Sequence, residues 1–274
     1  MKQIFYRFLV LLVGICFSAC TALERAEEDK VFHIIHVDEL GRKVSEIWTR
    51  PRIESLGVWE TSSKYFDRAM HTDGSRFSVV SFSRLLDLYK FKRGEDAVLL
   101  NCFDDYQGVL SLDDIRRYDL RLATKIKLKG FKPDWLSPLL ILVPDGKNPP
   151  FQERFMTASI RELKFVRLHD YYAPLELSSG SWPGVREGLK VFKNNCLFCH
   201  SLKGRGGNKG GRLLQAYAFS DEKDREKFLA DFKSFHHKDN LDKQDVEQFV
   251  TPDELESIIS YLKNLNRWGH AFGA

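Results

Sequence analysis

The chain has 274 residues, of which 43% are hydrophobic and 29% carry charges of both signs, a composition that supports packed cores and excludes a disordered tail. Its formal net charge is +4. Removing the first nineteen residues takes away Lys2 and Arg7 and leaves 40 basic side chains against 38 acidic ones, which argues against nucleic-acid binding.

The five cysteines exclude a small scaffold held together by disulfides. Two of them fall within the first twenty residues and two form a single C-x-x-C-H motif, so one thiol remains for any other role. A framework of intramolecular disulfides cannot be built from one thiol. In chain order the cysteines are Cys16, Cys20, Cys102, Cys196 and Cys199.

Residues 1–20 have the three parts of a secretory signal, namely a basic start, an apolar run and a small-residue exit. The apolar run is about a dozen residues long, shorter than the roughly 20 that a bilayer span needs. Its end resembles a bacterial lipobox, although Phe17 replaces the usual leucine. We therefore expect an exported protein on the periplasmic side of a bacterial membrane, anchored by a lipid on Cys20. A simple cleaved signal and an uncleaved anchor are the alternatives, and both also export the chain.

Residues 21–30 are polar and acidic, as a tether would be, and residues 31–176 are predicted to form a mixed α+β domain. Two serines occupy positions typical of helix caps, Ser83 before a leucine pair and Ser111 three residues before an aspartate. Apolar or alternating segments predict strands at 31–37, 97–102, 138–143 and 163–168.

Residues 177–183 are rich in serine and glycine and predict a linker to a second, all-α unit at 184–274. The last helix of this unit begins after Thr251, followed by a proline at the first helical position and a glutamate at the third. Its apolar face consists of Leu255, Ile258, Ile259, Leu262 and Leu265. Helical spacing also predicts a first helix that carries Val185, Gly188, Leu189 and Phe192.

Cys196, Cys199 and His200 form the C-x-x-C-H motif, the strongest chemical signal in the chain. Two thiols three residues apart can add to the two vinyl groups of one haem, and the histidine that follows can ligate its iron. The predicted export and the helices before and after the motif agree with this interpretation. The alternatives, half of a zinc site or a thiol redox pair, lack a second cysteine pair and the strand of a thioredoxin motif.

Residues 182–268 resemble a class I (monohaem) cytochrome c domain. The residues that carry the resemblance, besides the haem motif, are Gly188, Phe192, residues 201–204 and residues 259–262. In that family the first and last helices cross and a glycine admits an aromatic partner, which implies these roles for Gly188 and Tyr261. The resemblance also implies one covalent haem c and the transfer of electrons.

The sixth iron ligand is where this chain departs from that family. The usual ligand is a methionine shortly before the last helix, and Val246 falls near that place. The three methionines, Met1, Met70 and Met156, all precede the haem motif. The iron is therefore either open on one side or ligated by another residue.

His236 or His237 could supply that ligand, because both lie in the segment that normally carries it. Bis-histidine ligation generally lowers the reduction potential relative to a histidine–methionine pair. A pair of solvated surface histidines is the plainer alternative, and Lys238 and Lys243 are the fallback candidates.

The loop at 203–212 contains five glycines and four basic residues without an acid. We expect the glycines to let the backbone approach the porphyrin closely. The basic side chains would form a rim for an acidic redox partner: Lys203, Arg205, Lys209 and Arg212. A phosphate-binding loop is the weaker alternative, because the spacing fits neither glycine-rich phosphate motif.

Residues 82–166 resemble, at a lower level, the oxidoreductase molybdopterin-binding (sulfite-oxidase-like) superfamily. The matching pieces, in order, are residues 82–86, 97–106, 111–114, 122–123 and 138–144. In catalytic members a cysteine upstream of the first piece binds molybdenum, but this chain has no cysteine between Cys20 and Cys102. Bound molybdopterin is therefore not expected, and Cys102 is predicted to be a buried structural cysteine.

The remaining candidates in the first domain do not predict a catalytic residue. His33 and His36 fall on opposite faces of a strand, which argues against a shared metal. Asp104 and Asp105 directly precede Tyr106. Aspartates in such a position are more often turn residues than an acid–base pair.

The sequence therefore predicts an exported electron carrier with one covalent haem, more an electron carrier than a catalyst, whose first domain serves docking or assembly. One alternative is a molybdenum-dependent oxidoreductase with a fused haem acceptor. The other is a haem-based sensor of a small gas or of redox state.

Overall fold

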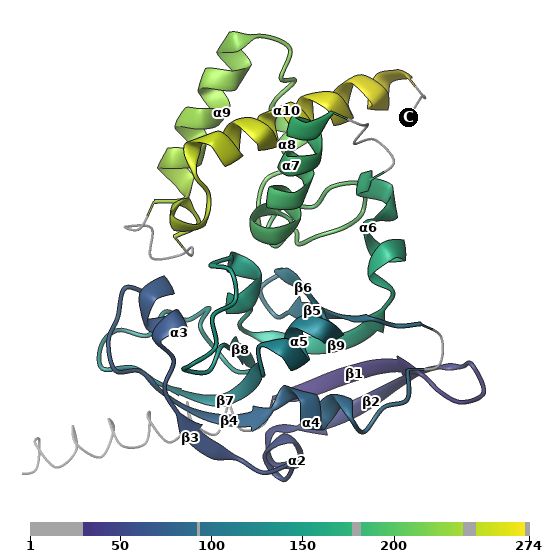
Figure 1. The fold of residues 1–274 in the computed structure, drawn as a ribbon, viewed down its shortest axis with the longest axis vertical. Helices are drawn as coiled ribbons and strands as arrows, with labels where there is room; N and C mark the ends of the chain where they lie inside the picture. Colours follow the sequence, from purple (N-terminus) through teal and green to yellow (C-terminus); the bar gives the residue numbers. More distant parts are fainter. Residues whose placement is uncertain (1–29, 92–93, 177–181, 238–244, 272–274) are drawn as a thin grey trace, which may run out of the picture.

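The structure is a computed structural model, and it describes residues 30–91, 94–176, 182–237 and 245–271. The predicted signal, nearly all of the tether and most of the linker lie outside the described residues, as do Lys238 and Lys243. The N-terminal part consists mainly of strands and short helices, and the C-terminal part is a group of helices that sits on one side of it (Figure 1). No helix within the described ranges is long and apolar enough to cross a membrane.

Two β-sheets with short helices between their strands build the N-terminal part, so it is a mixed α/β unit. The five-stranded sheet has the order β2 (Lys43–Thr49), β1 (Val31–Val37), β9 (Ile160–Val166), β5 (Ala97–Cys102), β6 (Gln107–Ser111). The four-stranded sheet has the order β3 (Trp59–Thr61), β4 (Arg76–Ser81), β7 (Arg121–Lys127), β8 (Leu140–Leu142). All pairs are antiparallel except β1 with β9.

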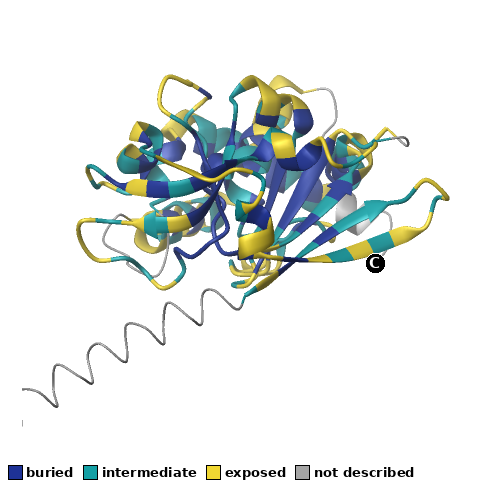
Figure 2. Cartoon of the chain, turned by 90° about the horizontal axis from the view of Figure 1, so that it is seen from below, coloured by how far each residue is buried: buried dark blue, intermediate teal, exposed yellow. Residues whose placement is uncertain are grey.

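Burial concentrates on the central strands (Figure 2). Strand β5 is apolar on both faces and buried on both, with Val98 and Leu100 inaccessible to solvent. The outer strand β2 instead alternates between exposed and half-buried residues. The strands predicted at 31–37 and 97–102 are confirmed with the same bounds.

Two strand predictions need correction. The strand expected at 138–143 is reduced to β8, because Pro138 has no N–H for a ladder and the Val143 carbonyl accepts from Ser63 Oγ at 2.6 Å. The strand expected at 163–168 ends at Val166, and helix α6 (Leu168–Glu176) follows at once.

The short helices begin at serine and threonine caps. Ser111 caps α5 (Leu112–Arg117) as predicted, since its side chain accepts from the Asp114 N–H at 3.0 Å. The cap predicted at Ser83 is wrong, because Ser81 accepts from the Arg84 N–H and Ser83 lies inside α4 (Phe82–Leu86). The other short helices of this part are α2 (Arg50–Glu54), α3 (Lys64–Ala69) and the 3-10 turn η1 (Glu153–Met156).

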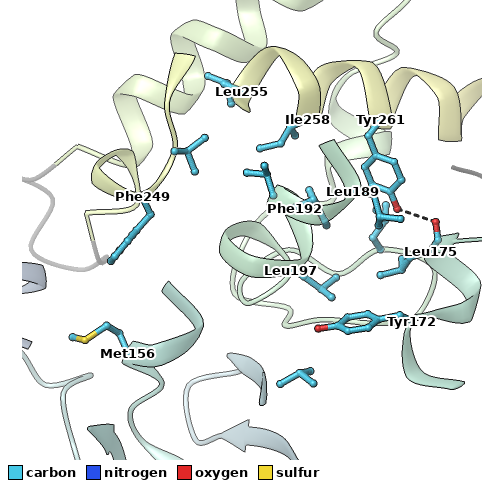
Figure 3. Close-up of a cluster of buried hydrophobic side chains, with 14 of the residues drawn as sticks. Met156, Tyr172, Leu175, Leu189, Phe192, Leu197, Phe249, Leu255, Ile258 and Tyr261 are labelled. Atoms are coloured by element: carbon cyan, nitrogen blue, oxygen red, sulfur yellow. Dashed lines mark hydrogen bonds between the residues drawn. The ribbon is translucent and has the colours of Figure 1, made fainter. Parts of the chain in front are cut away.

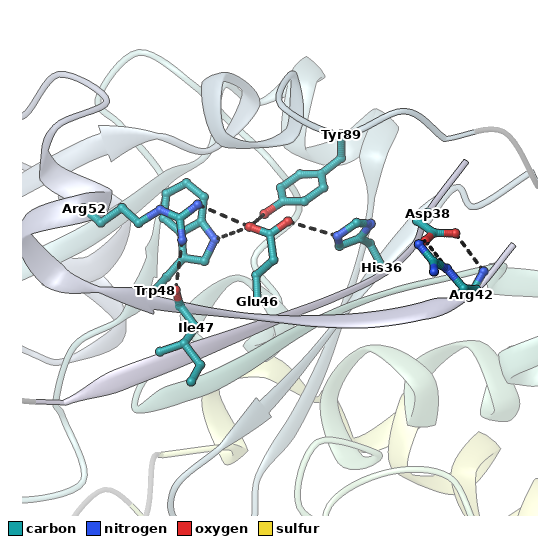
Figure 4. A network of polar contacts seen from close by, with 8 residues as sticks. All are labelled: His36, Asp38, Arg42, Glu46, Ile47, Trp48, Arg52 and Tyr89. Atoms are coloured by element: carbon teal, nitrogen blue, oxygen red, sulfur yellow. Dashed lines mark hydrogen bonds and ion pairs between the residues drawn. The ribbon is translucent and has the colours of Figure 1, made fainter. Parts of the chain in front are cut away.

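Glu46 organises a polar network on the outer strands (Figure 4). Its carboxylate pairs with His36 Nε2 at 3.0 Å and accepts from Trp48 Nε1 at 3.1 Å. His33 instead contacts Ser45 Oγ at 3.4 Å. The two histidines therefore have separate partners, as their opposite positions on the strand predicted.

The C-terminal part is helical, as predicted. Its elements are α7 (Pro183–Val191), the π turn η2 (Phe192–Cys196), α8 (Leu213–Ala216), α9 (Glu222–Phe235), the 3-10 turn η3 (Glu247–Phe249) and α10 (Pro252–Ala271). Helix α10 begins with the predicted capping box, because Thr251 Oγ1 accepts from the Glu254 N–H and the Glu254 carboxylate accepts from the Thr251 N–H.

Helices α7 and α10 cross, with Leu189 and Tyr261 among the side chains packed where they meet (Figure 3), and this contact fixes the frame of the C-terminal part. A Cβ atom at Gly188 would lie 1.8 Å from the Ser257 carbonyl oxygen, so only glycine fits there. Tyr261 is fully buried beside it, and its hydroxyl donates to the Leu175 carbonyl at 3.2 Å. The predicted pairing of Gly188 with Tyr261 is confirmed.

Backbone hydrogen bonds join the two parts directly. The Gln107 N–H of β6 donates to the Phe198 carbonyl at 3.0 Å, and the Asn208 N–H donates to the Asp105 carbonyl at 2.9 Å. Phe151 packs against Phe249 with ring centroids 4.6 Å apart. The loop that carries the C-x-x-C-H motif therefore rests on the end of the five-stranded sheet.

Candidate functional site

A cavity of about 300 Å³ lies within the C-terminal part and is closed at one end by the N-terminal part. Its wall is mainly apolar, and it includes Phe192, Leu213, Phe228, Phe232, Val246, Leu255 and Ile258. The polar side chains of the wall include both cysteines and the histidine of the motif. An apolar cavity with a few polar groups is the usual form of a cofactor site.

The two motif cysteines reach this wall because the chain winds tightly after α7. The Leu197 N–H donates to the Phe192 carbonyl at 2.8 Å across the π turn, and the Cys199 N–H donates to the Cys196 carbonyl at 3.1 Å. Burial raises the pKa of the Cys196 thiol above its ordinary value, with the nearby Glu153 as a second cause. The thiol pair therefore faces an apolar space large enough for a bulky group.

His200 is held in one orientation by its surroundings. Its Nδ1 lies 2.7 Å from the Gly211 carbonyl oxygen, and because a carbonyl can only accept, Nδ1 must be the protonated nitrogen. In the neutral ring Nε2 then carries the lone pair that a metal requires. A Cβ atom at Gly210 would lie 2.5 Å from the ring, so glycine is needed for this close approach.

His236 lines the same cavity as His200. The two ring centroids are 6.1 Å apart. His236 Nδ1 lies 3.0 Å from the Phe232 carbonyl oxygen, and the ring stacks on Phe232 at 4.8 Å. The structure thus brings His236 to the site, whereas His237 is exposed and does not contribute to the cavity wall.

Val246 is the residue that the register predicts near the place of the family's methionine. Val246 is buried and belongs to the cavity wall. An aliphatic side chain cannot ligate iron, so Val246 is not a candidate for the sixth ligand.

The glycine-rich loop behind the motif is folded against the motif itself. Cβ atoms at Gly206 and Gly207 would lie 2.4 Å from the Leu197 and 2.1 Å from the Phe198 carbonyl oxygens. Of the predicted basic rim, Lys203, Lys209 and Arg212 are exposed. Arg205 is not available as a rim residue, because its Nε donates to the Tyr171 carbonyl at 2.8 Å and ties the loop to α6.

Cys102, Asp104 and Asp105 lie where the sequence predicted. Cys102 is buried, and burial raises the pKa of its thiol well above the ordinary value. Asp104 and Asp105 form the turn between β5 and β6, and burial also raises the pKa of Asp104. None of the three belongs to the cavity wall.

Glu153 is a site residue that sequence reasoning missed. It comes from the N-terminal part, is fully buried and lines the cavity. Neither carboxylate oxygen has a hydrogen-bond partner among the described residues. No local motif marks Glu153, since its position at the cavity depends on packing between segments about forty residues apart in the chain, as in its N–H bond to Asn195 Oδ1 at 3.2 Å.

Comparison with known protein families decides the identity of the helical part. The model of the family described as "Cytochrome c" matches residues 185–266. These residues form a cytochrome c domain. Such a domain implies covalently bound haem c and suggests electron transfer. No curated protein matches the chain.

The residues of this cytochrome c domain fit a haem. Two thiols and an imidazole stand on the wall of one apolar cavity. The imidazole tautomer is the one that ligates metals, and Gly210 leaves room beside its ring. The two thiols and the imidazole, the apolar wall of the cavity and the orientation of His200 are therefore all consistent with a bound haem.

Proposed function

We propose that the protein is an exported c-type cytochrome that carries electrons through one haem. Cys196 and Cys199 would hold the haem by thioether bonds, and His200 would ligate the iron through Nε2. When bound, the haem supplies a one-electron couple. The chain's own contribution is to hold the histidine, to exclude water with an apolar wall and to keep the group in one position.

The observation that carries this proposal is the spacing of His200 and His236. Two imidazoles on opposite sides of one metal have ring centroids about 6.3 Å apart, since each metal–nitrogen bond is about 2.0 Å and each centroid lies about 1.15 Å behind its nitrogen. The separation in the structure is 6.1 Å. This agreement favours His236 as the residue that would hold the iron together with His200.

Bis-histidine ligation favours an electron carrier over a gas sensor. A sensor needs an open iron position that a small molecule can occupy, whereas two protein ligands close both positions. Closed ligation also keeps the iron environment similar in both oxidation states, which suits electron transfer. The sensor is therefore the second candidate.

Absorption spectra of protein matured in a host that attaches haem test the ligation. We expect a low-spin spectrum and slow binding of carbon monoxide by the ferrous form. The His236→Ala variant should become high-spin and bind carbon monoxide readily, and the His237→Ala variant serves as a matched control with unchanged spectra. A low-spin spectrum retained by His236→Ala would contradict the assignment.

For the N-terminal part we propose a role in docking or assembly, with a fold related to the sulfite-oxidase-like superfamily. The support for a non-catalytic role is the burial of Cys102, its distance in sequence from the position of a molybdenum ligand, and its raised thiol pKa. Metal analysis tests this. About one iron and no molybdenum per chain is expected, and stoichiometric molybdenum would favour the enzyme alternative.

We further propose that Cys20 is lipidated and that the protein works on the periplasmic side of a bacterial membrane. The support is the signal-like sequence of residues 1–20. Cys20→Ser should abolish incorporation of labelled fatty acid and release the protein from the membrane fraction. Lys203, Lys209 and Arg212 are exposed, which supports an acidic redox protein as the partner.

A further inference from the structure

Glu153 is the one carboxyl group on the cavity wall that comes from the N-terminal part. It is 0% exposed, and neither of its oxygens has a hydrogen-bond partner among the described residues. Its backbone is fixed, because its N–H donates to Asn195 Oδ1 at 3.2 Å, one residue before Cys196. The carboxyl is therefore held in place at the cavity without any contact that would stabilise its charge.

Such a placement has no structural benefit. An unpaired carboxylate in an apolar site costs free energy, and an apolar side chain of similar size would be more stable there. Burial accordingly raises the pKa of Glu153 to about 8. The group can thus exist in either protonation state close to neutral pH, so a small change of nearby charge decides which one is populated.

The groups around Glu153 do not offset its charge. Tyr106 and Cys196, from neighbouring elements, are groups on which the charge of Glu153 acts, and burial raises the pKa of both, which keeps them neutral. The other titratable groups on the cavity wall are Cys199, His200, Lys209, Tyr217, Asp231 and His236. Of these, Lys209 is exposed and Asp231 binds Tyr217 and Lys227. The charge that varies in this cavity is that of the cofactor.

We propose that Glu153 is a proton-binding site linked to the oxidation state of the haem, so that the protein moves a proton together with each electron. This inference rests on the proposed function. A ferric haem has one more positive charge than a ferrous one, and in an apolar cavity this charge acts strongly on a neighbouring carboxylate. Oxidation therefore favours ionised Glu153, and reduction favours the protonated acid.

The balance of the step is one electron and one proton. An external one-electron donor reduces the haem, and the Glu153 carboxylate takes one proton from solvent to form the neutral acid. When the electron leaves to an acceptor, the O–H bond of the acid breaks and the proton returns to solvent. The net charge inside the cavity is the same before and after each transfer.

Spectroelectrochemical titration of the haem-loaded full-length protein between about pH 5 and about pH 10 tests the proposal. The reduction potential should fall as pH rises, with a slope that approaches about 59 mV per tenfold change in proton concentration for a one-electron couple. Glu153→Gln, which keeps the shape but cannot ionise, should flatten this slope while leaving the haem spectrum unchanged. Glu226→Gln, an exposed glutamate on α9, is the matched control and should keep the slope.

A second measurement does not depend on the variant folding. Infrared difference spectra of the wild-type protein should gain the carbonyl stretch of a protonated carboxyl group on reduction and lose it on oxidation. A flat potential in the wild-type protein, or a slope that survives in Glu153→Gln, would overturn the role of Glu153. Absence of covalent haem would instead overturn the proposed function, so the two failures can be told apart.

Discussion

The two parts of the molecule differ in what completes their cores. The N-terminal part fills one core, which includes Phe32, Val98 and Leu100, with its own side chains, and a second cluster of its buried side chains continues into the C-terminal part. The C-terminal part surrounds a cavity of about 300 Å³ with the faces of its helices. The first part is therefore expected to depend less on the haem than the second, whose cavity the haem would fill.

The largest loss of stability is expected when haem attachment is prevented by the Cys196→Ala/Cys199→Ala double variant. We expect the C-terminal helices to lose stabilisation on the order of 4 kcal/mol, the size typical of a tightly bound ligand. Hydrogen exchange should show loss of protection in α7, α9 and α10 but not in β5 and β9. Cys102→Ala is the control, since it removes a thiol from the other part and should keep the haem. Equal loss of protection in both parts would refute the distinction.

A second prediction concerns the frame of the C-terminal part. Gly188→Ala places a Cβ atom 1.8 Å from a backbone oxygen of α10, so the helices must move apart. Overpacking of this kind should cost about 3 kcal/mol in the free energy of unfolding, measured by chemical denaturation. Gly184→Ala in the same helix meets no atom within 4 Å, and it should leave stability unchanged or slightly improved.

A third prediction follows from Glu153, at the boundary of the two parts. Its ordinary pKa is 4.5 and burial raises it to about 8 in the folded protein. Between these values the folded state holds a proton that the unfolded state has released, so the free energy of unfolding should fall as pH rises from about 4.5 to about 8. Measured by denaturation of the haem-loaded full-length protein, Glu153→Gln should reduce this fall by a few kcal/mol. A pH profile identical to that of the wild type would contradict the raised pKa.

The smallest expected effect tests the contact between the parts at the surface. His71 Nε2 lies 2.9 Å from the Asp245 carboxylate, and the His71 side chain is 56% exposed. An exposed ion pair contributes less than about 1 kcal/mol, so His71→Gln should shift the unfolding midpoint only slightly. His169→Gln, at another exposed histidine, is the control. A larger loss of stability would mean that this surface contact contributes more to holding the two parts together than an exposed pair normally does.

The sequence predicted those elements whose determinants lie close together in the chain. The Thr251 capping box, the strand at 97–102 and the crossing at Gly188 each follow from residues a few positions apart or from one steric requirement. Helix α6 was missed because its start is set from a distance, with the Leu168 N–H donating to Asp96 at 2.6 Å. A long-range cap of this kind leaves no mark in the sequence next to the helix.

Some residues of the candidate site could likewise be predicted from the sequence, and others required the structure. The C-x-x-C-H motif and the candidate histidines were visible because the chemistry of haem requires those residue types. The distinction between His236 and His237 required the structure, since neighbouring residues differ only in the direction that the end of α9 gives them. Glu153 required it as well, because a buried carboxyl outside any motif becomes significant only when its surroundings are known.

The hydrogen bond from Gln107 to Phe198 also bears on the order of events during biogenesis. Phe198 lies between the two cysteines that would attach the haem, and both cysteines are only partly exposed with the strand end docked against this loop. An attachment enzyme needs both thiols within reach together with the haem vinyl groups. We therefore expect haem attachment to precede the docking of the strand end against the motif loop. The N-terminal part, although synthesised first, would then reach its final position last.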